Sequence, residues 1–567
     1  MLSHNLNFTV LKRKDLLWII LLSVIVLIPN FFLAFYGSDL SGAIIKTGAY
    51  IFISCLLFLL PSLVLKAKVF FLVQGIFVVL APLEIAHIYM NKMTITSGYL
   101  MSIVDTNWDE FSEVFSSINI PIFCYLGLCV FYFFIAIKKI DNTYLIHSKK
   151  IRLYVLSGFV FVLIAGYGFY LRKSYQIVPN KKEVFSKTNE VFTLKFYKIY
   201  PYDLILQSKR IYSLKKELKK GKKELLHFQF NAKKENRLTQ KEVYVFIIGE
   251  TGRYGNYSIN GYNRETSPLL KETSNLITYS DFHSSSNITE FSLPTILTRA
   301  TPQDFHLRFK EKSFVDAFKE AGFKTYWIAN QSAGNSFIRR ISKDADGEYF
   351  TTTDFDAAEN FDEKLWVFMN NVLQNDDEKA LIVLHTLGSH FRYNFRYPDK
   401  YNVFQPSFEG TFDYALISPK NKEEFINTYD NSILYTDFFI ANTIQKINDL
   451  DCISTVIYMS DHGENLYDTN ENIALHGGSI YTKYDFHVPF FVWTSDKYNV
   501  QYPDKVENIK SNKDKKLCAG NVFHSILDIA DITFPEQKLS KSIASEWLQE
   551  DSVRYIINTN MEMRKGY

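Results

Sequence analysis

Long apolar runs occupy the first 171 residues of the chain, whereas the remainder alternates short apolar runs with polar stretches. Five of the early runs approach or reach the length that crosses a bilayer as a helix. We therefore expect transmembrane helices at residues 16–36, 47–65, 69–90, 120–137 and 154–171. Buried helices of a soluble core would be shorter and amphipathic, so that alternative is not favoured.

Basic residues are distributed unevenly around these runs. They precede the first run and separate the second from the third and the fourth from the fifth, whereas the other two connections hold only Lys46 and Lys92. The positive-inside rule then predicts a cytoplasmic amino terminus and an outer, periplasmic location for everything after residue 171. No small-residue cleavage site follows the first run, which we expect to be retained as an anchor. The basic residues are Lys12, Arg13, Lys14, Lys66, Lys68, Lys138, Lys139, Lys149, Lys150 and Arg152.

The polar part of the chain predicts a different architecture. Beyond residue 241, apolar runs of strand length alternate with helical stretches, which predicts a mainly parallel α/β sheet with helices on both faces. The runs are 243–248, 324–329, 380–384, 455–459 and 490–493. We therefore expect a multi-domain protein with a five-helix transmembrane domain at 1–171, a bridging segment at 172–240 and a catalytic domain at 241–567. The lysine-rich stretch 213–220 in the bridge indicates either a solvated helix face or contact with anionic lipid headgroups.

Composition narrows the possible partners and crosslinks. The formal net charge is only +3, and no basic patch indicates a nucleic-acid partner. Of the five cysteines, only Cys452 and Cys518 lie in the exported part, where they could form at most one disulfide. The catalytic domain must therefore be held together mainly by its own core.

Two of the predicted strands stop abruptly at acids, Glu250 and Asp461. Because open α/β sheets bind ligands at the carboxyl ends of their strands, these carboxylates are candidate metal ligands. Asp461 is followed directly by His462, and adjacent carboxylate and imidazole ligands suit zinc. Thr289 lies in a polar stretch between the two strands, and coordination to a divalent cation is one of the few ways to activate a hydroxyl as a nucleophile.

Each of these residues also has an ordinary explanation. An acid at a strand end can cap a helix, threonines in polar loops are common, and a single histidine is more often structural than a ligand. The case for a site comes from clustering, since several histidines lie at or just after strand ends. They are His385, His390, His462 and His476.

Together these residues resemble the phosphoethanolamine transferases of bacterial outer-membrane lipids, the family that includes the lipid A enzymes behind colistin resistance. The most specific match is Gly249-Glu250-Thr251 continuing through residues 260–270, which is similar to the family's opening block. Thr289 stands five residues before Pro294, as the family's nucleophilic threonine does before its own proline. The resemblance extends over nearly the whole chain and implies an alkaline-phosphatase-like, or sulfatase-like, catalytic domain behind a membrane domain.

The resemblance also implies roles for individual residues. The principal zinc ion would be held by Glu250, Thr289, Asp461 and His462, and a second cation is left open. His390 and His476 match the histidines that line the donor or second-metal side, where either could act as general acid or base. The implied substrate contacts are Ser332 in the substrate pocket and the membrane-proximal pair Thr106 and Glu110, which would help to place the lipid donor.

Several positions depart from the family pattern. Ser285 and Thr295 stand where lipid A enzymes usually carry disulfide-forming cysteines, and Asn335 stands where a lysine often occurs. Ser102 replaces an asparagine one turn before Thr106. These differences leave the acceptor open and favour core sugar over lipid A.

The implied function is zinc-dependent transfer of phosphoethanolamine from phosphatidylethanolamine to lipopolysaccharide or lipooligosaccharide, through a covalent threonine intermediate, by a monomer in the inner membrane. A phosphoglycerol transferase of the lipoteichoic-acid or periplasmic-glucan type would share fold, threonine and metal. A sulfatase activity is not favoured, because the Cys or Ser followed by x-Pro-x-Arg that matures to formylglycine is missing around Thr289. A non-catalytic membrane scaffold would not need a complete set of metal ligands.

Overall fold

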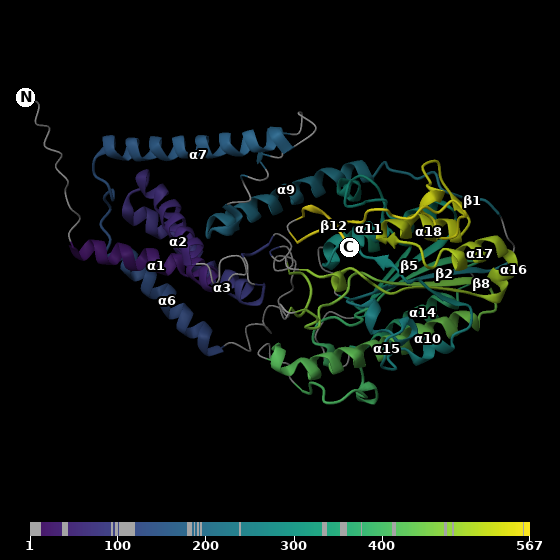
Figure 1. Ribbon diagram of the computed structural model, residues 1–567. Helices are drawn as coiled ribbons and strands as arrows, with labels where there is room; N and C mark the ends of the chain where they lie inside the picture. The colour runs from purple at the N-terminus through teal and green to yellow at the C-terminus, as the bar shows by residue number, and fades with distance from the viewer. Residues whose placement is uncertain are drawn as a thin grey trace, which may run out of the picture. The chain divides into compact units, whose positions relative to one another are not determined.

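The structure is a computed structural model whose described residues fall into two compact units, one ending at residue 212 and the other beginning at residue 213 (Figure 1). The described residues are 13–36, 44–91, 94–96, 100, 119–177, 184–185, 188–189, 192, 196–236, 240–331, 337–351, 360–375, 377–410, 416–469, 473–478, 481–559 and 561–567. The expected domain boundaries at 171 and 240 remain predictions.

The first unit consists of helices. They are α1 (Arg13–Tyr36), α2 (Ile44–Leu59), α3 (Ala67–Asn91), α6 (Asn119–Lys138), α7 (Lys149–Ile177) and the start of α9 (Tyr202–Leu225). Side chains of α1, α3 and α6 share one buried apolar cluster, which includes Leu22, Phe71 and Tyr132. The Tyr132 hydroxyl donates to the carbonyl oxygen of Phe71 at 2.8 Å, so the phenol of α6 is satisfied inside an apolar interface.

The helix count differs from the expected five. Within the described residues, four helices are long and apolar enough to cross a membrane: Leu16–Tyr36, Lys46–Leu63, Ala67–Tyr89 and Lys149–Tyr175. The expected run at 120–137 contributes only a shorter apolar helix, Cys124–Lys138. An apolar helix of that length rises about 22 Å, less than the hydrocarbon core of about 30 Å. Five spanning helices are therefore not confirmed.

The second unit is built on a seven-stranded sheet formed by described residues, with strand order β3-β9-β8-β2-β7-β5-β6. The strands are β2 (Glu242–Gly249), β3 (Leu276–Thr278), β5 (Lys324–Ala329), β6 (Gly347–Phe350), β7 (Lys379–His385), β8 (Ile453–Ser460) and β9 (Phe490–Thr494). All five predicted strands are present. The five strands from β8 to β6 are parallel, whereas β9 is antiparallel to both of its neighbours, β8 and the edge strand β3.

Both faces of the sheet are covered by helices, as predicted. Alternate residues of β2 enter two different cores, with Phe246 and Ile248 in one and Val245 and Ile247 in the other. Helices α14 (Leu365–Leu373) and α15 (Lys422–Asn448) cover one face, and α11 (Thr289–Leu297), α12 (Phe314–Glu320) and α18 (Val522–Ile529) cover the other (Figure 1). Burial on both sides explains why these strands are continuous apolar runs.

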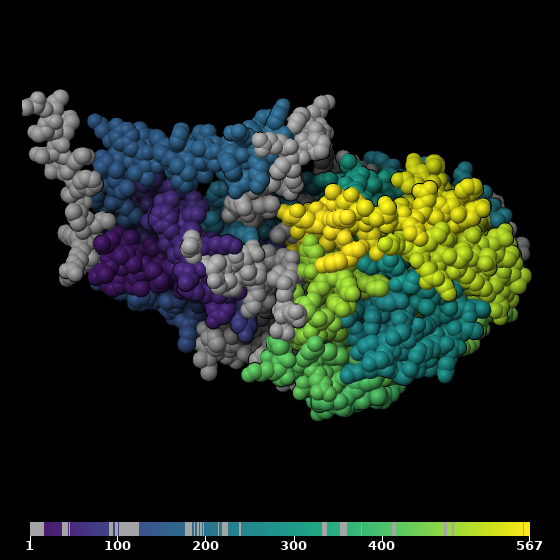
Figure 2. All heavy atoms as spheres, viewed as in Figure 1, coloured from purple at the N-terminus to yellow at the C-terminus, as the bar shows by residue number. Residues whose placement is uncertain are grey.

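Shorter elements complete the second unit. The helices are α10 (Pro268–Glu272), α13 (Phe337–Ser342), α16 (Asp496–Gln501) and α17 (Pro503–Ser511). The strands are β1 (Lys233–Lys234), β4 (Phe282–His283), β10 (Leu517–Cys518), β11 (Ile532–Thr533), β12 (Tyr555–Ile557) and β13 (Met563–Lys565). Teal and yellow segments, far apart in sequence, lie side by side on the face of this unit shown in Figure 2. In the interior, Ser286 and Ile557 form a bridge between two such distant segments.

Candidate metal centre and active site

The two acids predicted from the strand ends lie at the carboxyl ends of neighbouring strands. β2 and β8 are paired in parallel, and the last residues of the two strands, Gly249 and Ser460, are partners in the ladder. Glu250 and Asp461 follow directly, and both are fully buried or nearly so. The register of the sheet therefore delivers both carboxylates to one point, although 211 positions separate them in numbering.

The turn after Glu250 is held in an unusual backbone conformation. Thr251 has φ +59°, in the left-handed region that disfavours residues with a side chain. Its N–H donates to Oδ1 of Asp461 at 3.1 Å, and its carbonyl oxygen accepts from the Tyr429 hydroxyl at 2.7 Å. Its hydroxyl donates to Oε1 of Glu250 at 3.0 Å. Strain of this kind persists where surrounding contacts over-determine it, which is common at functional sites.

Thr289 is the first residue of α11, and its hydroxyl faces the Glu250 side chain at the carboxyl end of β2. Oγ1 lies 3.3 Å from each carboxylate oxygen of Glu250 and 3.3 Å from Nε2 of His462. The same Nε2 lies 3.3 Å from Oε1 of Glu250 and 3.4 Å from Oδ2 of Asp461. Donor atoms around a tetrahedral zinc ion with bonds of about 2.0–2.1 Å are about 3.3–3.4 Å apart. These separations match that spacing.

Two further observations indicate that the donor set fits zinc. Oδ2 of Asp461 is buried and, among the described residues, has no hydrogen-bond partner, whereas Oδ1 accepts from the His462 N–H at 2.8 Å. Nδ1 of His462 lies 2.9 Å from the carbonyl oxygen of Gly463, so Nδ1 can carry the proton and leave the Nε2 lone pair facing the cluster. A backbone contact of this kind is the usual way to orient a ligating histidine.

The electrostatics of the cluster show an excess of negative charge. Burial alone would lower the pKa of His462, but the charges of Asp461 and Glu250 outweigh it and raise that pKa to about 10. Burial and the charge of Glu250 raise the pKa of Asp461. Burial acts to raise the pKa of Glu250 too, but the hydrogen bond and charge of His462 outweigh it and lower that pKa. A divalent cation is suited to balance this charge.

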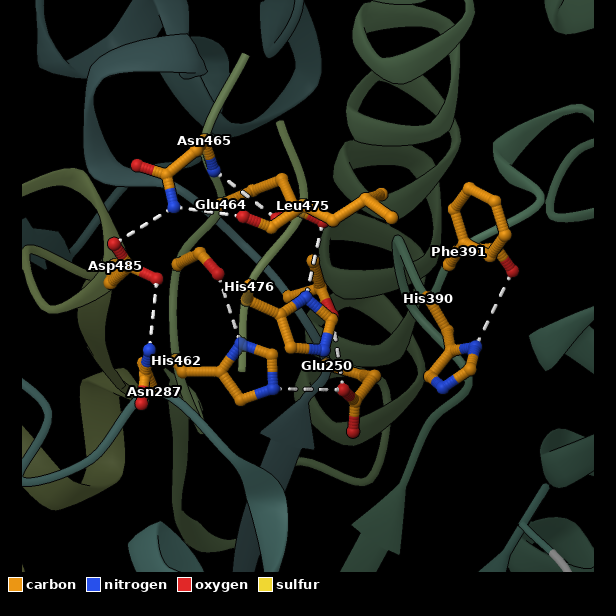
Figure 3. A network of polar contacts seen from close by, with 12 residues as sticks. Glu250, Asn287, His390, Phe391, His462, Glu464, Asn465, Leu475, His476 and Asp485 are labelled. Carbon is orange, nitrogen blue, oxygen red and sulfur yellow. Dashed lines mark hydrogen bonds and ion pairs between the residues drawn. The ribbon is translucent and has the colours of Figure 1, made fainter. Parts of the chain in front are cut away.

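His476 joins the cluster from a separate loop (Figure 3). One donor atom each from Glu250, His462 and His476 lie within 4.8 Å of one another, and the rings of His462 and His476 are 4.0 Å apart between centroids. Nδ1 of His476 lies 3.2 Å from Oε2 of Glu464, which also accepts from the Tyr393 hydroxyl at 2.7 Å. Burial raises the pKa of Glu464 to about 8.

The other two histidines singled out from the sequence lie elsewhere around the centre. His390 follows β7 and lies on the far side of Glu250 from His462 in Figure 3, with Nδ1 3.3 Å from the carbonyl oxygen of Phe391. It is not among the three clustered donors. His385 is fully buried at the end of β7, edge-on to Trp327, and burial lowers its pKa to about 4.

A buried amide and carboxylate network supports the loops and was not predicted. The Asn465 side chain donates to Oδ2 of Asp485 at 2.8 Å and to the carbonyl oxygen of Leu475 at 2.8 Å. Asn287, two residues before Thr289, donates to Oδ1 of Asp485 at 3.3 Å (Figure 3). The network links the loop before Thr289 to the loop of His476.

Close backbone packing explains why position 463 of the Asp461-His462-Gly463-Glu464 motif is a glycine. A Cβ atom on Gly463 would lie 2.0 Å from the carbonyl oxygen of Tyr484. The Gly463 N–H donates to the carbonyl oxygen of Asp485 at 2.8 Å. Only glycine allows this approach, which brings the metal-ligand loop against the segment that carries Asp485.

Some predicted positions lie outside the described residues: Ser102, Thr106, Glu110, Ser332 and Asn335. Ser285 and Thr295, the positions of the family's usual cysteines, are both buried. Thr295 donates to the carbonyl oxygen of Ser292 at 2.7 Å, whereas the Ser285 carbonyl accepts from the Ile557 N–H at 2.8 Å. Cys452 and Cys518 are free thiols.

The amino-acid sequence was compared with protein families and with curated proteins. A model of the sulfatase family matches residues 242–532. The chain is 29% identical over 331 residues to phosphoethanolamine transferase EptC of Escherichia coli strain K12, covering 55% of each chain. It is 31% identical over 312 residues to the Kdo(2)-lipid A phosphoethanolamine 7''-transferase of Salmonella typhimurium strain LT2, covering 53% of each. The chain thus spans about half the length of these curated relatives.

Solved structures show similar folds. The carboxyl-terminal periplasmic domain of EcEptC from Escherichia coli, solved in complex with zinc, has a TM-score of 0.53 at 28% identity and covers 59% of this chain and 95% of that one. The integral membrane lipooligosaccharide phosphoethanolamine transferase A (EptA) from Neisseria meningitidis has a TM-score of 0.67 at 21% identity, covering 93% of this chain and 98% of that one. The latter likeness concerns the fold alone, a helical region followed by a sulfatase-like domain.

Proposed function

The chain belongs to the sulfatase family, and from this premise we propose that it transfers phosphoethanolamine from phosphatidylethanolamine to lipopolysaccharide or lipooligosaccharide. The names of the relatives support the transferred group, since EptC is a phosphoethanolamine transferase and the Salmonella relative acts on Kdo(2)-lipid A. The apolar helices of the first unit support a membrane-anchored enzyme that meets a lipid donor. The orientation that we propose places the catalytic unit in the periplasm.

The observation that carries the proposal is the arrangement of Thr289. Its hydroxyl lies 3.3 Å from Glu250 and His462, at the amino end of a nine-residue helix. The partial positive charge of a helix amino terminus favours a developing alkoxide and an incoming phosphate. A hydroxyl in this position is suited to nucleophilic attack on phosphorus rather than to a structural hydrogen bond alone.

The residues that would hold the metal are Glu250, Asp461, His462 and Thr289 itself. The comparison with the zinc complex of the EcEptC domain supports zinc, and a second cation next to His476 remains part of the proposal. When bound, zinc would supply Lewis-acid stabilisation of the negative charge on Thr289 Oγ1 and on the phosphoryl oxygens.

In the first half of the reaction, Oγ1 of Thr289 forms a bond to the phosphorus of phosphatidylethanolamine. The bond from phosphorus to the glycerol oxygen breaks, and diacylglycerol leaves once that oxygen has gained a proton. The product is a phosphoethanolamine ester of Thr289. Glu250 holds the hydroxyl in line through its carboxylate, and the turn at Thr251 in turn holds Glu250.

In the second half, a hydroxyl or phosphate of the acceptor attacks the same phosphorus and releases Thr289. We assign the proton transfers of the two halves to His476 and His390, which lie in separate positions around Glu250 (Figure 3). Glu464 and Tyr393 orient His476 through the contact at Nδ1. Donor placement by Thr106 and Glu110 and a substrate contact by Ser332 remain parts of the proposal.

Trapping the covalent intermediate tests this function. The full-length chain is incubated with phosphatidylethanolamine vesicles without acceptor, and the peptide that contains Thr289 is analysed by mass spectrometry. Phosphoethanolamine on Thr289, with none in Thr289→Ala, is the expected result. Phosphoglycerol from phosphatidylglycerol vesicles instead would favour the alternative transferase, and no adduct from either lipid would contradict both. Mass spectrometry of lipid A and core oligosaccharide from cells with and without the gene then locates the acceptor.

A further inference from the structure

A second group of potential metal ligands lies upstream of Thr289 in the same chain segment. One donor atom each from Asp281, His283 and His487 lie within 4.8 Å of one another. Asp281 and His283 are two positions apart in an extended segment around β4, so their side chains share a face. His487 is the antiparallel bridge partner of His283 and adds the third donor from across the strands.

The spacing within this group suits a small divalent ion. Oδ1 of Asp281 lies 3.3 Å from Nε2 of His283, which is about the separation of two donors around tetrahedral zinc. The ring of His487 is 5.0 Å from that of His283 between centroids. The third donor, on His487, lies within 4.8 Å of the other two.

Neighbouring groups hold the imidazoles in place. The ring of His487 is stacked on Tyr254 at 4.0 Å with an interplanar angle of 11°. Nε2 of His487 lies 3.0 Å from the carbonyl oxygen of Ser280, which favours the proton on Nε2 and leaves the lone pair on Nδ1. An imidazole that is oriented by a backbone carbonyl is typical of ligating histidines.

The group also has the charge and access that a metal ion needs. Burial lowers the pKa values of both histidines, that of His487 to about 4, so both imidazoles are neutral near pH 7. Burial acts to raise the pKa of Asp281, but the His283 hydrogen bond and the charge of Arg554 outweigh it and lower that pKa to about 2. Asp281 and His487 are only partly buried, which leaves a route from solvent.

We propose that Asp281, His283 and His487 form a second metal site, for zinc or another borderline divalent transition metal, distinct from the ligands around Thr289. Two imidazoles and one carboxylate are a donor set for such ions, with solvent water completing the coordination. The backbone already pairs here, since the Val488 N–H donates to the carbonyl oxygen of Phe282 at 3.1 Å. A bound ion would add a side-chain crosslink between the segment leading to Thr289 and the segment leading into β9.

Arg554 is the competitor for this site. Its Nη2 lies 2.7 Å from Oδ1 of Asp281 and donates to the Asp281 carbonyl oxygen at 2.9 Å. The guanidinium partly neutralises the only anionic ligand. Metal affinity should therefore rise when this cation is removed, which is the opposite of what loss of a purely structural contact would produce.

The test counts metal ions on the full-length protein in detergent. Zinc is supplied at defined free concentrations and the bound zinc per chain is measured for the wild type, His283→Ala/His487→Ala and a matched control, His306→Ala. His306 is exposed and lies against Glu217, outside the cluster. Wild type and control are expected to bind one more equivalent than the double variant. Equal stoichiometry in all three proteins would overturn the proposal.

Two single variants, each also made together with Asp461→Asn, distinguish zinc bound at this site from zinc bound at the catalytic centre. Asp281→Asn should lose the extra equivalent with less disturbance of folding than the double variant. Arg554→Gln should tighten its binding by up to about fivefold. Both effects should persist on an Asp461→Asn background, in which the catalytic ligand set is impaired. If the extra equivalent disappears with Asp461→Asn alone, or if Arg554→Gln weakens it, the ion does not bind where we propose.

Discussion

Two clusters in the same unit combine carboxylates and imidazoles, yet their electrostatics are opposite. Around Thr289, two buried carboxylates raise the pKa of His462 to about 10. Around Asp281, burial lowers the pKa of His487 to about 4, and Arg554 already pairs with the carboxylate. The two clusters therefore differ in net charge although they are built from the same residue types. The charge of the first cluster favours a bound cation, whereas the carboxylate of the second is already paired with Arg554.

The largest expected effect tests whether the first cluster is a reaction centre at all. Thr289→Ala removes the proposed nucleophile, so transfer should fall by about 10³-fold or more. The three other ligands remain, so bound zinc and melting temperature should change little. Activity is measured with phosphatidylethanolamine vesicles, and zinc by elemental analysis. A variant that keeps more than a few per cent of wild-type transfer would show that Thr289 is not the nucleophile.

Removing a carboxylate tests the charge argument directly. Glu250→Ala and Asp461→Ala each take away a ligand and a negative charge, so zinc affinity should fall by at least about 100-fold and transfer should be lost with it. The matched change at the second cluster, Asp281→Asn, should leave transfer nearly unaltered. Bound zinc is measured by elemental analysis after dialysis, and transfer with phosphatidylethanolamine vesicles. Full zinc occupancy in Glu250→Ala and in Asp461→Ala would mean that the principal site lies elsewhere.

Glu464→Gln tests how the first cluster is oriented. Glutamine keeps the shape and can still accept from the Tyr393 hydroxyl, but it weakens the polar contact with Nδ1 of His476. We expect transfer to fall by about 10–100-fold with zinc at the principal ligands retained. Tyr393→Phe is the milder partner variant, because it removes one contact to Glu464 and none to His476. A wild-type pH profile and rate in Glu464→Gln would exclude this positioning role.

The smallest expected effect is a pH-dependent change in stability at the second cluster, that of Asp281, His283 and His487. Because the pKa of Asp281 is lowered from 3.8 to about 2, its charge stabilises the fold above about pH 4. That contribution disappears as the pH falls toward 2. In chelator, Asp281→Asn should cost at most about 2 kcal/mol at pH 6, since the side chain is 31% exposed. Melting temperatures of the two proteins should converge at low pH, and a constant difference would contradict the charge assignment.

The sequence predicted the framework of the catalytic unit well, for a physical reason. Strands buried on both faces are continuous apolar runs, so β2, β5, β7, β8 and β9 could each be recognised, and so could the acids that end β2 and β8. The direction of β9 could not, because an apolar run carries no sign of parallel or antiparallel pairing. The helix at 119–138 shows a related limit, since apolar composition alone does not determine a spanning length.

Polar support was harder to predict than the ligands themselves. Asn287, Asn465 and Asp485 are ordinary loop residues in sequence, and only the folded chain brings their side chains together. His283 and His487 were not singled out because neither ends a long apolar run: β4 is only two residues long, and His487 lies before β9. Candidate ligands at strand ends can be predicted from the local sequence pattern. Contacts between loops that are distant in sequence depend on the tertiary fold and cannot.

The left-handed backbone at Thr251 sets stability and activity against each other. A residue with a Cβ in that conformation costs about 1–2 kcal/mol relative to glycine, yet the Thr251 hydroxyl helps to fix Glu250. Glycine would relax the turn and loosen the carboxylate. During evolution or directed selection, pressure for thermal robustness alone would favour that exchange, and only selection for turnover would oppose it. Thr251 thus couples a local cost in folding free energy to the placement of the Glu250 carboxylate.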